Sequence, residues 1–362
     1  MKLRALVLAL CMAAGVTAAA ELQGVYVLPT ERCGDYFMVQ MTVNGDPGRT
    51  LSMLLDTGAS HTVIDVDAAE RVAGKPIAIG RYARFGQLVA GDLRFSGVRA
   101  RVLRMDHLQL AIGAPLDGIL GFPTFKELLL TIDYPAGEVR VRPGSLPSPD
   151  GERILRTIKE KRRPVIALDF GGYRRPVLID SGAWGGFVLR DSDALRFIEE
   201  PVVYDSSLRI DRVMIKSGAR LSGDVRLATA TLVQPTIQVA ESTELVGTEV
   251  LNNFSMTFDQ KRRRVLFEQK KDEPLEFPAM RDLGWSISPK NEGYRVLRVF
   301  DGLGADRAGI LPGDLVVAID GTPVYERDLC ERKQEQRPEV PVSVEREGER
   351  MEFTVPVDIV VP

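Results

Sequence analysis

The sequence has few of the residues that metal-binding and most nucleophilic chemistries need. Its 362 residues include three cysteines and two histidines, His61 and His107. No group of cysteine and histidine has the spacing of a zinc site, so we expect no metal and no other cofactor. The pattern Gly-x-Ser-x-Gly is also absent, which leaves a serine hydrolase of that type without support.

An excess of charge of one sign is lacking too. The chain has 47 Lys and Arg residues against 50 Asp and Glu residues, for a net charge of −3, and the basic residues are dispersed. Nucleic-acid binding needs concentrated positive charge, so we expect no nucleic-acid partner. With 44% hydrophobic residues, the chain is long enough for two or three packed domains.

Only the first twenty residues contain a long apolar run. Lys2 and Arg4 precede the apolar segment Ala5–Val16, and Ala18–Ala20 follow it. This order predicts a signal peptide over residues 1–20, cleaved near Ala20. The run is too short for a membrane anchor, so no membrane span is expected after cleavage. A periplasmic or secreted location follows.

Two cysteines, Cys33 and Cys330, would remain after cleavage. In an oxidising compartment they would either pair or stay as two separate buried thiols. The sequence leaves both alternatives open, and separate thiols are the commoner outcome for so distant a pair.

The most informative feature is a motif that occurs twice. The segment LLDTGAS, Leu54–Ser60, contains Asp56, and VLIDSGA, Val177–Ala183, contains Asp180. A carboxylate in such apolar surroundings is costly unless it is hydrogen-bonded, paired or shares a proton. A single copy would be a weak signal, but two copies 124 residues apart indicate a duplication.

Other short segments follow each copy in the same order. The matched pairs are Gly91–Phe95 with Gly223–Leu227, Ile119–Gly121 with Leu245–Gly247, and Leu130–Asp133 with Met256–Asp259. We interpret the chain as two copies of one lobe.

These paired motifs resemble those of the pepsin-like and retropepsin-like aspartic proteases, over roughly Val25 to Phe267. The resemblance implies a mainly β fold with two homologous, β-barrel-like lobes that each contribute one catalytic aspartate, Asp56 or Asp180, to a shared site. One carboxyl would be ionised and activate a water while the other is protonated. The resemblance also implies that the loops around the two aspartates are supported by Thr57, Gly58, Ser181 and Gly182.

Local patterns place the first motif on a strand. Alternation from Val25 predicts strands that are interrupted by a turn at Asn44–Gly48, with Arg49–Leu55 returning to deliver Asp56. Asp65 is placed to cap a short helix that extends to Val72. A proline- and glycine-containing polar linker at Pro143–Gly151 and a charged, proline-containing linker at Gln269–Pro278 predict one lobe over residues 21–148 and a second over residues 149–270.

The remaining segment, residues 276–360, is of another type. Its run Gly304–Val324 resembles the core of a bacterial PDZ domain, a small α+β fold, and Val342–Val355 would supply a closing hairpin. By this resemblance Leu283, Gly284 and Trp285 would form the loop whose N–H groups bind the terminal carboxylate of a peptide.

Two positions near the motifs, Trp184 and Tyr82, have two interpretations each. Trp184 either narrows the cleft or packs behind the turn, and core packing is the commoner fate of tryptophan. Tyr82 is either a flap residue or a surface tyrosine. Ala59 and Ala183 offer the aspartates no hydroxyl donor, which favours a pH optimum of roughly 5 to 7.

The sequence thus predicts an exported aspartic endopeptidase that hydrolyses extended peptides with a water activated by paired aspartates. A PDZ domain would recruit or gate the substrate, and the partners would be a peptide or protein substrate and a C-terminal peptide ligand. The alternatives are a catalytically inactive adaptor or sensor that binds peptides, and a processing enzyme dedicated to one membrane-protein partner.

Overall fold

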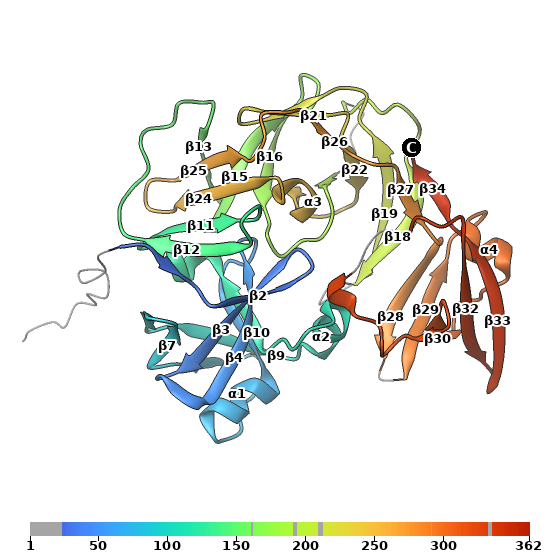
Figure 1. Cartoon of the computed structure of the whole chain (residues 1–362), viewed down its shortest axis with the longest axis horizontal. Helices are drawn as coiled ribbons and strands as arrows, with labels where there is room; N and C mark the ends of the chain where they lie inside the picture. The colour runs from blue at the N-terminus through green and yellow to red at the C-terminus, as the bar shows by residue number, and fades with distance from the viewer. Residues whose placement is uncertain (1–23, 161, 191–193, 209–212, 291, 332–334) are drawn as a thin grey trace, which may run out of the picture.

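The computed structural model describes residues 24–160, 162–190, 194–208, 213–290, 292–331 and 335–362 (Figure 1). The predicted signal peptide, residues 1–20, lies outside them. Strands make up most of the regular structure, which confirms the mainly β prediction. Across the described ranges we find no helix with the length and apolar character needed to cross a membrane.

The first lobe is built on a nine-stranded sheet with the order β6-β9-β5-β10-β4-β3-β7-β8, with β2 paired to β3. Its strands are β2 (Thr30–Cys33), β3 (Tyr36–Val43), β4 (Asp46–Asp56), β5 (Thr62–Asp65), β6 (Tyr82–Arg84), β7 (Gln87–Ala90), β8 (Leu93–Ser96), β9 (Arg99–Leu103) and β10 (Gly118–Gly121). Its helices are α1 (Val66–Ala73), α2 (Asp106–Ile112) and the 3-10 turn η1 (Phe122–Phe125).

Two local predictions for this lobe are confirmed. Asn44 and Gly45 both have positive φ, 57° and 73°, and turn β3 into β4 as a two-residue hairpin requires. Asp65 caps α1, because its Oδ1 accepts a hydrogen bond from the Asp67 N–H at 2.8 Å.

The second lobe repeats this topology. Its sheet has the order β14-β15-β16-β23-β17-β22-β19-β18. The strands are β14 (Ile158–Glu160), β15 (Arg163–Asp169), β16 (Arg174–Ile179), β17 (Phe187–Leu189), β18 (Val202–Leu208), β19 (Val213–Arg220), β22 (Thr236–Val239) and β23 (Leu245–Val246), and the helix is α3 (Thr248–Leu251). In each lobe the strand that ends at the aspartate, β4 or β16, pairs in parallel with the short apolar strand β10 or β23.

One sequence correspondence is wrong. Gly91–Phe95 forms the turn into β8 and its first residues, whereas Gly223–Leu227 contains β20 (Val225–Leu227). Strand β20 lies against β15 as β7 lies against β3, so β20 is the counterpart of β7 and not of β8. Strand β20 pairs with β21 (Ala230–Val233), the counterpart of β8. Every sheet in the described ranges ends in two edge strands, so neither lobe forms a closed barrel there.

A six-stranded sheet joins the lobes, with the order β1-β12-β11-β24-β25-β13 (Figure 1). Its strands are β1 (Tyr26–Val27), β11 (Leu129–Asp133), β12 (Glu138–Arg142), β13 (Ile154–Arg156), β24 (Phe254–Asp259) and β25 (Arg264–Gln269). At its centre Thr131 lies opposite Thr257, and their Oγ1 atoms are 2.8 Å apart. One continuous apolar core runs from Leu28 to Phe267 through both lobes.

The two predicted linkers are packed rather than free. Leu146 in the first is 3% exposed, and its N–H donates to Asp259 Oδ2 at 3.1 Å. The second contains β26 (Leu275–Glu276), which pairs with β21, and Phe277 packs against the core of the lobes. Proline and glycine content indicated linkers but did not reveal these buried apolar anchors.

The C-terminal unit has its own apolar core, which includes Trp285 and Val342. Its strands are β28 (Trp285–Lys290), β29 (Gly293–Val299), β30 (Leu315–Ile319), β31 (Thr322–Pro323), β32 (Glu339–Arg346) and β33 (Glu349–Pro356), with α4 (Gly304–Ala308), the 3-10 turn η2 (Leu329–Glu331), and the separate pair β27 (Met280–Asp282) and β34 (Asp358–Val361). Strands β32 and β33 form the expected hairpin.

This unit is docked on both lobes. A disulfide joins Cys33 of the first lobe to Cys330 in η2, so the expectation of two separate thiols is wrong. Strand β28 lies against α2 of the first lobe and β18 of the second (Figure 1). The distance of 297 residues between the cysteines hid the pairing, which only the docking of the unit brings about.

Candidate active site

Asp56 and Asp180 come together from the two lobes. Asp56 is the last residue of β4, where it lies opposite Gly121 of β10. Asp180 directly follows β16, and its N–H donates to Val246 O at 3.0 Å. In each strand the residues directly before the aspartate are buried, and the two half-buried carboxyl groups form a hydrogen bond with each other.

The loops that contain the two aspartates lock together through four reciprocal hydrogen bonds. Thr57 Oγ1 donates to Ile179 O at 2.7 Å and accepts from the Ser181 N–H at 3.0 Å. Ser181 Oγ donates to Leu55 O at 2.9 Å and accepts from the Thr57 N–H at 3.0 Å. Thr57 is 0% and Ser181 2% exposed, so water does not compete for these bonds.

Gly58 and Gly182 each pack against the aspartate of the opposite lobe. A Cβ on Gly58 would lie 2.4 Å from Asp180 Oδ2, and one on Gly182 would lie 2.7 Å from Asp56 Cγ. Backbone N–H groups complete the arrangement, from Ala59 to Asp56 Oδ1 at 2.9 Å and from Gly182 to Asp180 Oδ1 at 3.0 Å. No residue with a side chain fits either position without moving a carboxyl group.

Burial, and then the adjacent charge of Asp180, raise the pKa of Asp56 well above its ordinary value. The N–H groups of Gly58 and Ala59 act in the opposite direction but do not outweigh them. Two carboxyl groups in contact cannot both ionise readily, so they retain one shared proton into a higher pH range. The pair is therefore suited to hold one acid and one base at the same time.

The first turn of α3 supports the Asp180 loop. The Thr248 N–H donates to Ala183 O at 2.9 Å and the Glu249 N–H to Gly185 O at 3.0 Å. Thr248 Oγ1 also donates to Asp35 Oδ2 at 3.2 Å, which brings the β2–β3 turn of the first lobe to this point. Sequence reasoning missed Asp35 and Glu249, because neither belongs to a repeated motif.

Buried Tyr134 lies behind the site. Its hydroxyl has no hydrogen-bond partner in the described part of the chain, and burial is the main cause that raises its pKa. The charge of Arg32 lowers this pKa, and the charges of Asp35 and Asp180 raise it.

The structure distinguishes between the alternatives for Trp184 and for Tyr82. Trp184 is 61% exposed, so the expectation that it packs in the core is wrong. Tyr82 is 49% exposed on the edge strand β6, where the Arg99 guanidinium lies 4.6 Å from its ring. Three strands separate β6 from β4, which favours a surface role for Tyr82.

The candidate peptide-binding loop of the C-terminal unit is occupied by a carboxylate of its own chain. The Gly284 N–H donates to Asp282 Oδ1 at 2.7 Å, and the Leu283 N–H also bonds this carboxylate. Trp285 is 7% exposed within the core of the unit. Asp282 therefore accepts hydrogen bonds from backbone N–H groups that the terminal carboxylate of a bound peptide would need.

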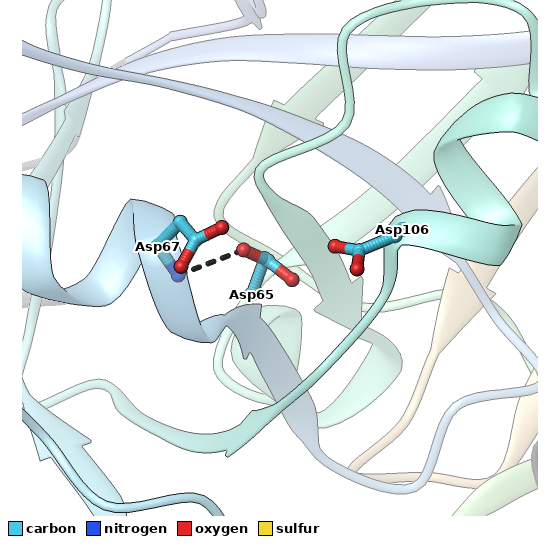
Figure 2. Close-up of side chains that lie close together, drawn as sticks. All are labelled: Asp65, Asp67 and Asp106. Atoms are coloured by element: carbon cyan, nitrogen blue, oxygen red, sulfur yellow. Dashed lines mark hydrogen bonds between the residues drawn. The ribbon is translucent and has the colours of Figure 1, made fainter. Parts of the chain in front are cut away.

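An acidic cluster in the first lobe has a structural explanation (Figure 2). Asp65 is 8% exposed, and its second oxygen accepts from the Met105 N–H at 2.9 Å, so both of its oxygens are used within the fold. The Arg104 guanidinium lies 3.4 Å from Asp106 and 4.0 Å from Asp67. These contacts satisfy the charges without a metal ion.

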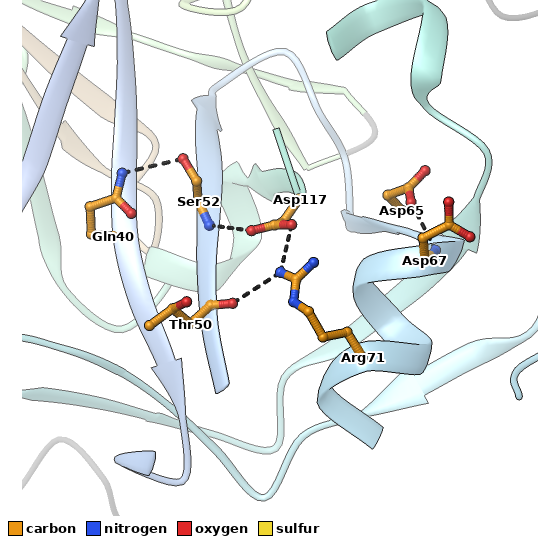
Figure 3. Close-up of polar contacts among 7 residues, drawn as sticks. All are labelled: Gln40, Thr50, Ser52, Asp65, Asp67, Arg71 and Asp117. Atoms are coloured by element: carbon orange, nitrogen blue, oxygen red, sulfur yellow. Dashed lines mark hydrogen bonds and ion pairs between the residues drawn. The ribbon is translucent and has the colours of Figure 1, made fainter. Parts of the chain in front are cut away.

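A neighbouring network ties α1 to the strand that delivers Asp56 (Figure 3). Arg71 donates to Asp117 Oδ1 at 2.7 Å and to Thr50 O at 3.2 Å. Asp117 Oδ2 accepts from the Ser52 N–H at 2.8 Å. The network fixes β4 against the start of β10, which is the pairing that positions Asp56.

Two comparisons with known proteins bear on this site. A family model for aspartyl proteases matches residues 39–124, which include Asp56 and β10 but end before the second lobe. Over 50 residues the chain is 46% identical to the putative serine protease HhoA of Synechocystis sp. (strain ATCC 27184 / PCC 6803 / Kazusa). That segment is 14% of this chain and 13% of the relative. The family model is one of aspartyl proteases, whereas the relative is named as a putative serine protease.

The described residues offer little to a serine mechanism. Ser60 Oγ and His61 Nδ1 are 3.1 Å apart, but they are adjacent in sequence and exposed. No carboxylate hydrogen-bonds His61 within the described ranges, so the third member of a catalytic triad is missing there.

Proposed function

We propose that the protein is an aspartic endopeptidase in which Asp56 and Asp180 activate one water for hydrolysis of an extended peptide. The observation that supports this most directly is the reciprocal lock of Thr57 and Ser181, which holds the two carboxyl groups in contact across the lobes. A non-catalytic scaffold has no need to keep such a costly pair intact.

In this mechanism the ionised carboxylate accepts a proton from the water, and the protonated carboxyl donates to the scissile carbonyl oxygen. The attacking oxygen forms a bond to the carbonyl carbon. In the collapse of the tetrahedral intermediate, the carboxyl that took the proton of the water donates it to the leaving nitrogen as the C–N bond breaks. The other carboxylate takes back the proton it gave to the carbonyl oxygen, which restores the pair. The N–H groups of Ala59 and Gly182 fix the orientation of the two carboxyl groups throughout.

For the C-terminal unit we favour gating over recruitment. Asp282 occupies the N–H groups of the loop, and β28 is covered by α2 and β18. A bound peptide terminus would have to displace both. Export to the periplasm or the exterior remains part of the proposal, because a disulfide suits an oxidising compartment.

The test is incubation of the purified protein with a peptide library, with and without a peptide whose scissile bond is replaced by a hydroxyethylene group. We expect cleavage that this analogue inhibits and that Asp180→Asn removes. The exposed Asp301→Asn serves as the matched control and should retain full activity. Binding of peptides without any cleavage would favour the adaptor alternative instead.

A further inference from the structure

The exposed Trp184 directly follows the second aspartate loop. Its neighbours Ala183 and Gly185 are held by the backbone of α3, yet its side chain is 61% exposed. The backbone around Trp184, four residues after Asp180, is thus held in place, while its side chain is largely exposed to solvent. An indole in this position offers a ligand a large apolar face together with an N–H donor.

A carboxyl group without a partner lies close by. A Cβ on Gly186 would be 3.1 Å from Glu249 Oε2, so this carboxyl packs against the chain two residues beyond Trp184. Within the described ranges no donor hydrogen-bonds or pairs with it. Arg220, whose charge lowers the pKa of Glu249, donates to the carbonyls of Pro362, Gln234 and Pro278.

We propose that Trp184 and Glu249 form a subsite for a cationic side chain of the substrate, arginine above all. This assignment rests on the proposed peptidase function. A guanidinium stacks on an indole face and pairs with a carboxylate through two N–H groups, so an arginine uses both residues at once. An apolar side chain would use Trp184 alone and leave Glu249 unpaired.

The subsite should act on one side of the scissile bond only. In the first lobe Ser60 takes the position of Trp184, four residues after Asp56, and its hydroxyl contacts His61. The two-fold relation of the lobes is therefore broken here. We expect the arginine preference at a single substrate position.

Intrinsic fluorescence tests the subsite without hydrolysis. The chain has two tryptophans, and Trp285 is buried at 7% exposure in the C-terminal core. In an Asp180→Asn background, the spectrum of an added Trp184→Phe variant is subtracted to isolate the Trp184 signal. Octapeptides that carry arginine, norleucine or glutamate at each position in turn are then titrated. We expect arginine at one position to shift this signal and to bind about tenfold more tightly than norleucine.

Glu249→Gln should abolish the tenfold preference for arginine over norleucine and leave norleucine binding unchanged. Trp184→Leu should weaken both. The exposed residues Glu241 and Tyr325 provide matched controls as Glu241→Gln and Tyr325→Leu. The proposed subsite would be overturned by a Trp184 fluorescence signal that no peptide cleaved by the wild type changes. A full preference for arginine in Glu249→Gln would overturn it as well. A normal arginine response with no cleavage by the wild type would instead overturn the peptidase function alone.

Discussion

Each of the two aspartates depends on residues from both lobes. The carboxyl group of Asp56 accepts an N–H from its own loop, touches Gly182 of the other lobe and shares a hydrogen bond with Asp180. Because neither lobe contains a complete acid and base, loss of one carboxyl should be as damaging as loss of both.

The first prediction is that Asp56→Asn and Asp180→Asn each lower turnover by about 10³-fold or more, because each removes one half of the acid–base pair. Turnover is measured on a fluorogenic peptide, and circular dichroism checks the fold. A single variant that retained near-wild-type turnover would exclude the shared site.

The second prediction concerns pH. The pKa of Asp56 is raised in the folded protein, so activity should persist above the ordinary aspartate range and fall as pH rises through the raised value. The same shift stabilises the fold fully below the unfolded pKa of about 4, and this contribution is lost as pH rises through the folded pKa. The melting temperature of Asp56→Asn minus that of the wild type should therefore increase as pH rises.

Ala59→Ser offers a matched change at the same carboxyl. A hydroxyl that donates to Asp56 favours its ionised form, so both limbs of the pH–rate profile should move to lower pH. An unmoved profile in a folded Ala59→Ser enzyme, or a wild-type optimum near pH 3, would contradict the assignment of these limbs to the pair.

Among the elements, α1 and its cap show how the first lobe is held together. We predict that Asp65→Ala lowers the free energy of unfolding by about 2 to 4 kcal/mol, since it removes the cap and leaves the Met105 N–H without its acceptor. Asp67→Ala is the control, because its side chain is 73% exposed. Denaturant unfolding measures both, and a large stabilisation of the wild type by millimolar Ca²⁺ would show that the cluster binds metal instead.

The sequence predicts elements best where one local rule decides the outcome. The helix after Asp65, the turn at Asn44-Gly45 and the β32–β33 hairpin follow from capping and turn chemistry within a few residues. The exposure of Trp184, the burial of Leu146 and the pairing of Cys33 with Cys330 depend on segments far away in the chain. The equivalence of Gly91–Phe95 with Gly223–Leu227 failed because short polar segments repeat by chance.

At the scale of the whole molecule, the C-terminal unit is fastened to the lobes by covalent and polar contacts. Ser206 Oγ of β18 hydrogen-bonds Ser286 Oγ of β28, and a Cβ on Gly113 after α2 would lie 2.2 Å from Leu329 Cβ of η2. The disulfide between Cys33 and Cys330 adds a covalent link at η2. Movement of the unit therefore requires several contacts to open together.

The fourth prediction is that this docking weakens as pH rises. Burial raises the pKa of Asp282 to about 7, so its contribution to stability is complete below about 4 and is lost as pH rises through 7. The protection of the β18 and β28 amides from hydrogen exchange, measured relative to their intrinsic exchange rate at each pH, should be lower at pH 8 than at pH 6. Asp282→Asn should remove most of this difference, whereas Asp301→Asn should not.

The fifth prediction is that Cys330→Ser releases the unit further and lowers the melting temperature, with a typical cost of about 2 to 4 kcal/mol for a lost disulfide. Turnover of short peptides should change less than turnover of folded proteins if the unit gates access. Equal changes for the two kinds of substrate would argue against gating.

The register of the joining sheet also bears on the history of the chain. Thr131 lies opposite Thr257, its own counterpart in the other lobe. On either side of this pair, Leu130 lies opposite Phe258, the counterpart of Ile132, and Ile132 lies opposite Met256, the counterpart of Leu130. That is the pattern two identical chains adopt about a rotation axis. The two strands are therefore related by an approximate two-fold axis, as a duplication of one lobe would produce. Duplication then allowed each half to change alone, as Trp184 and Ser60 have done.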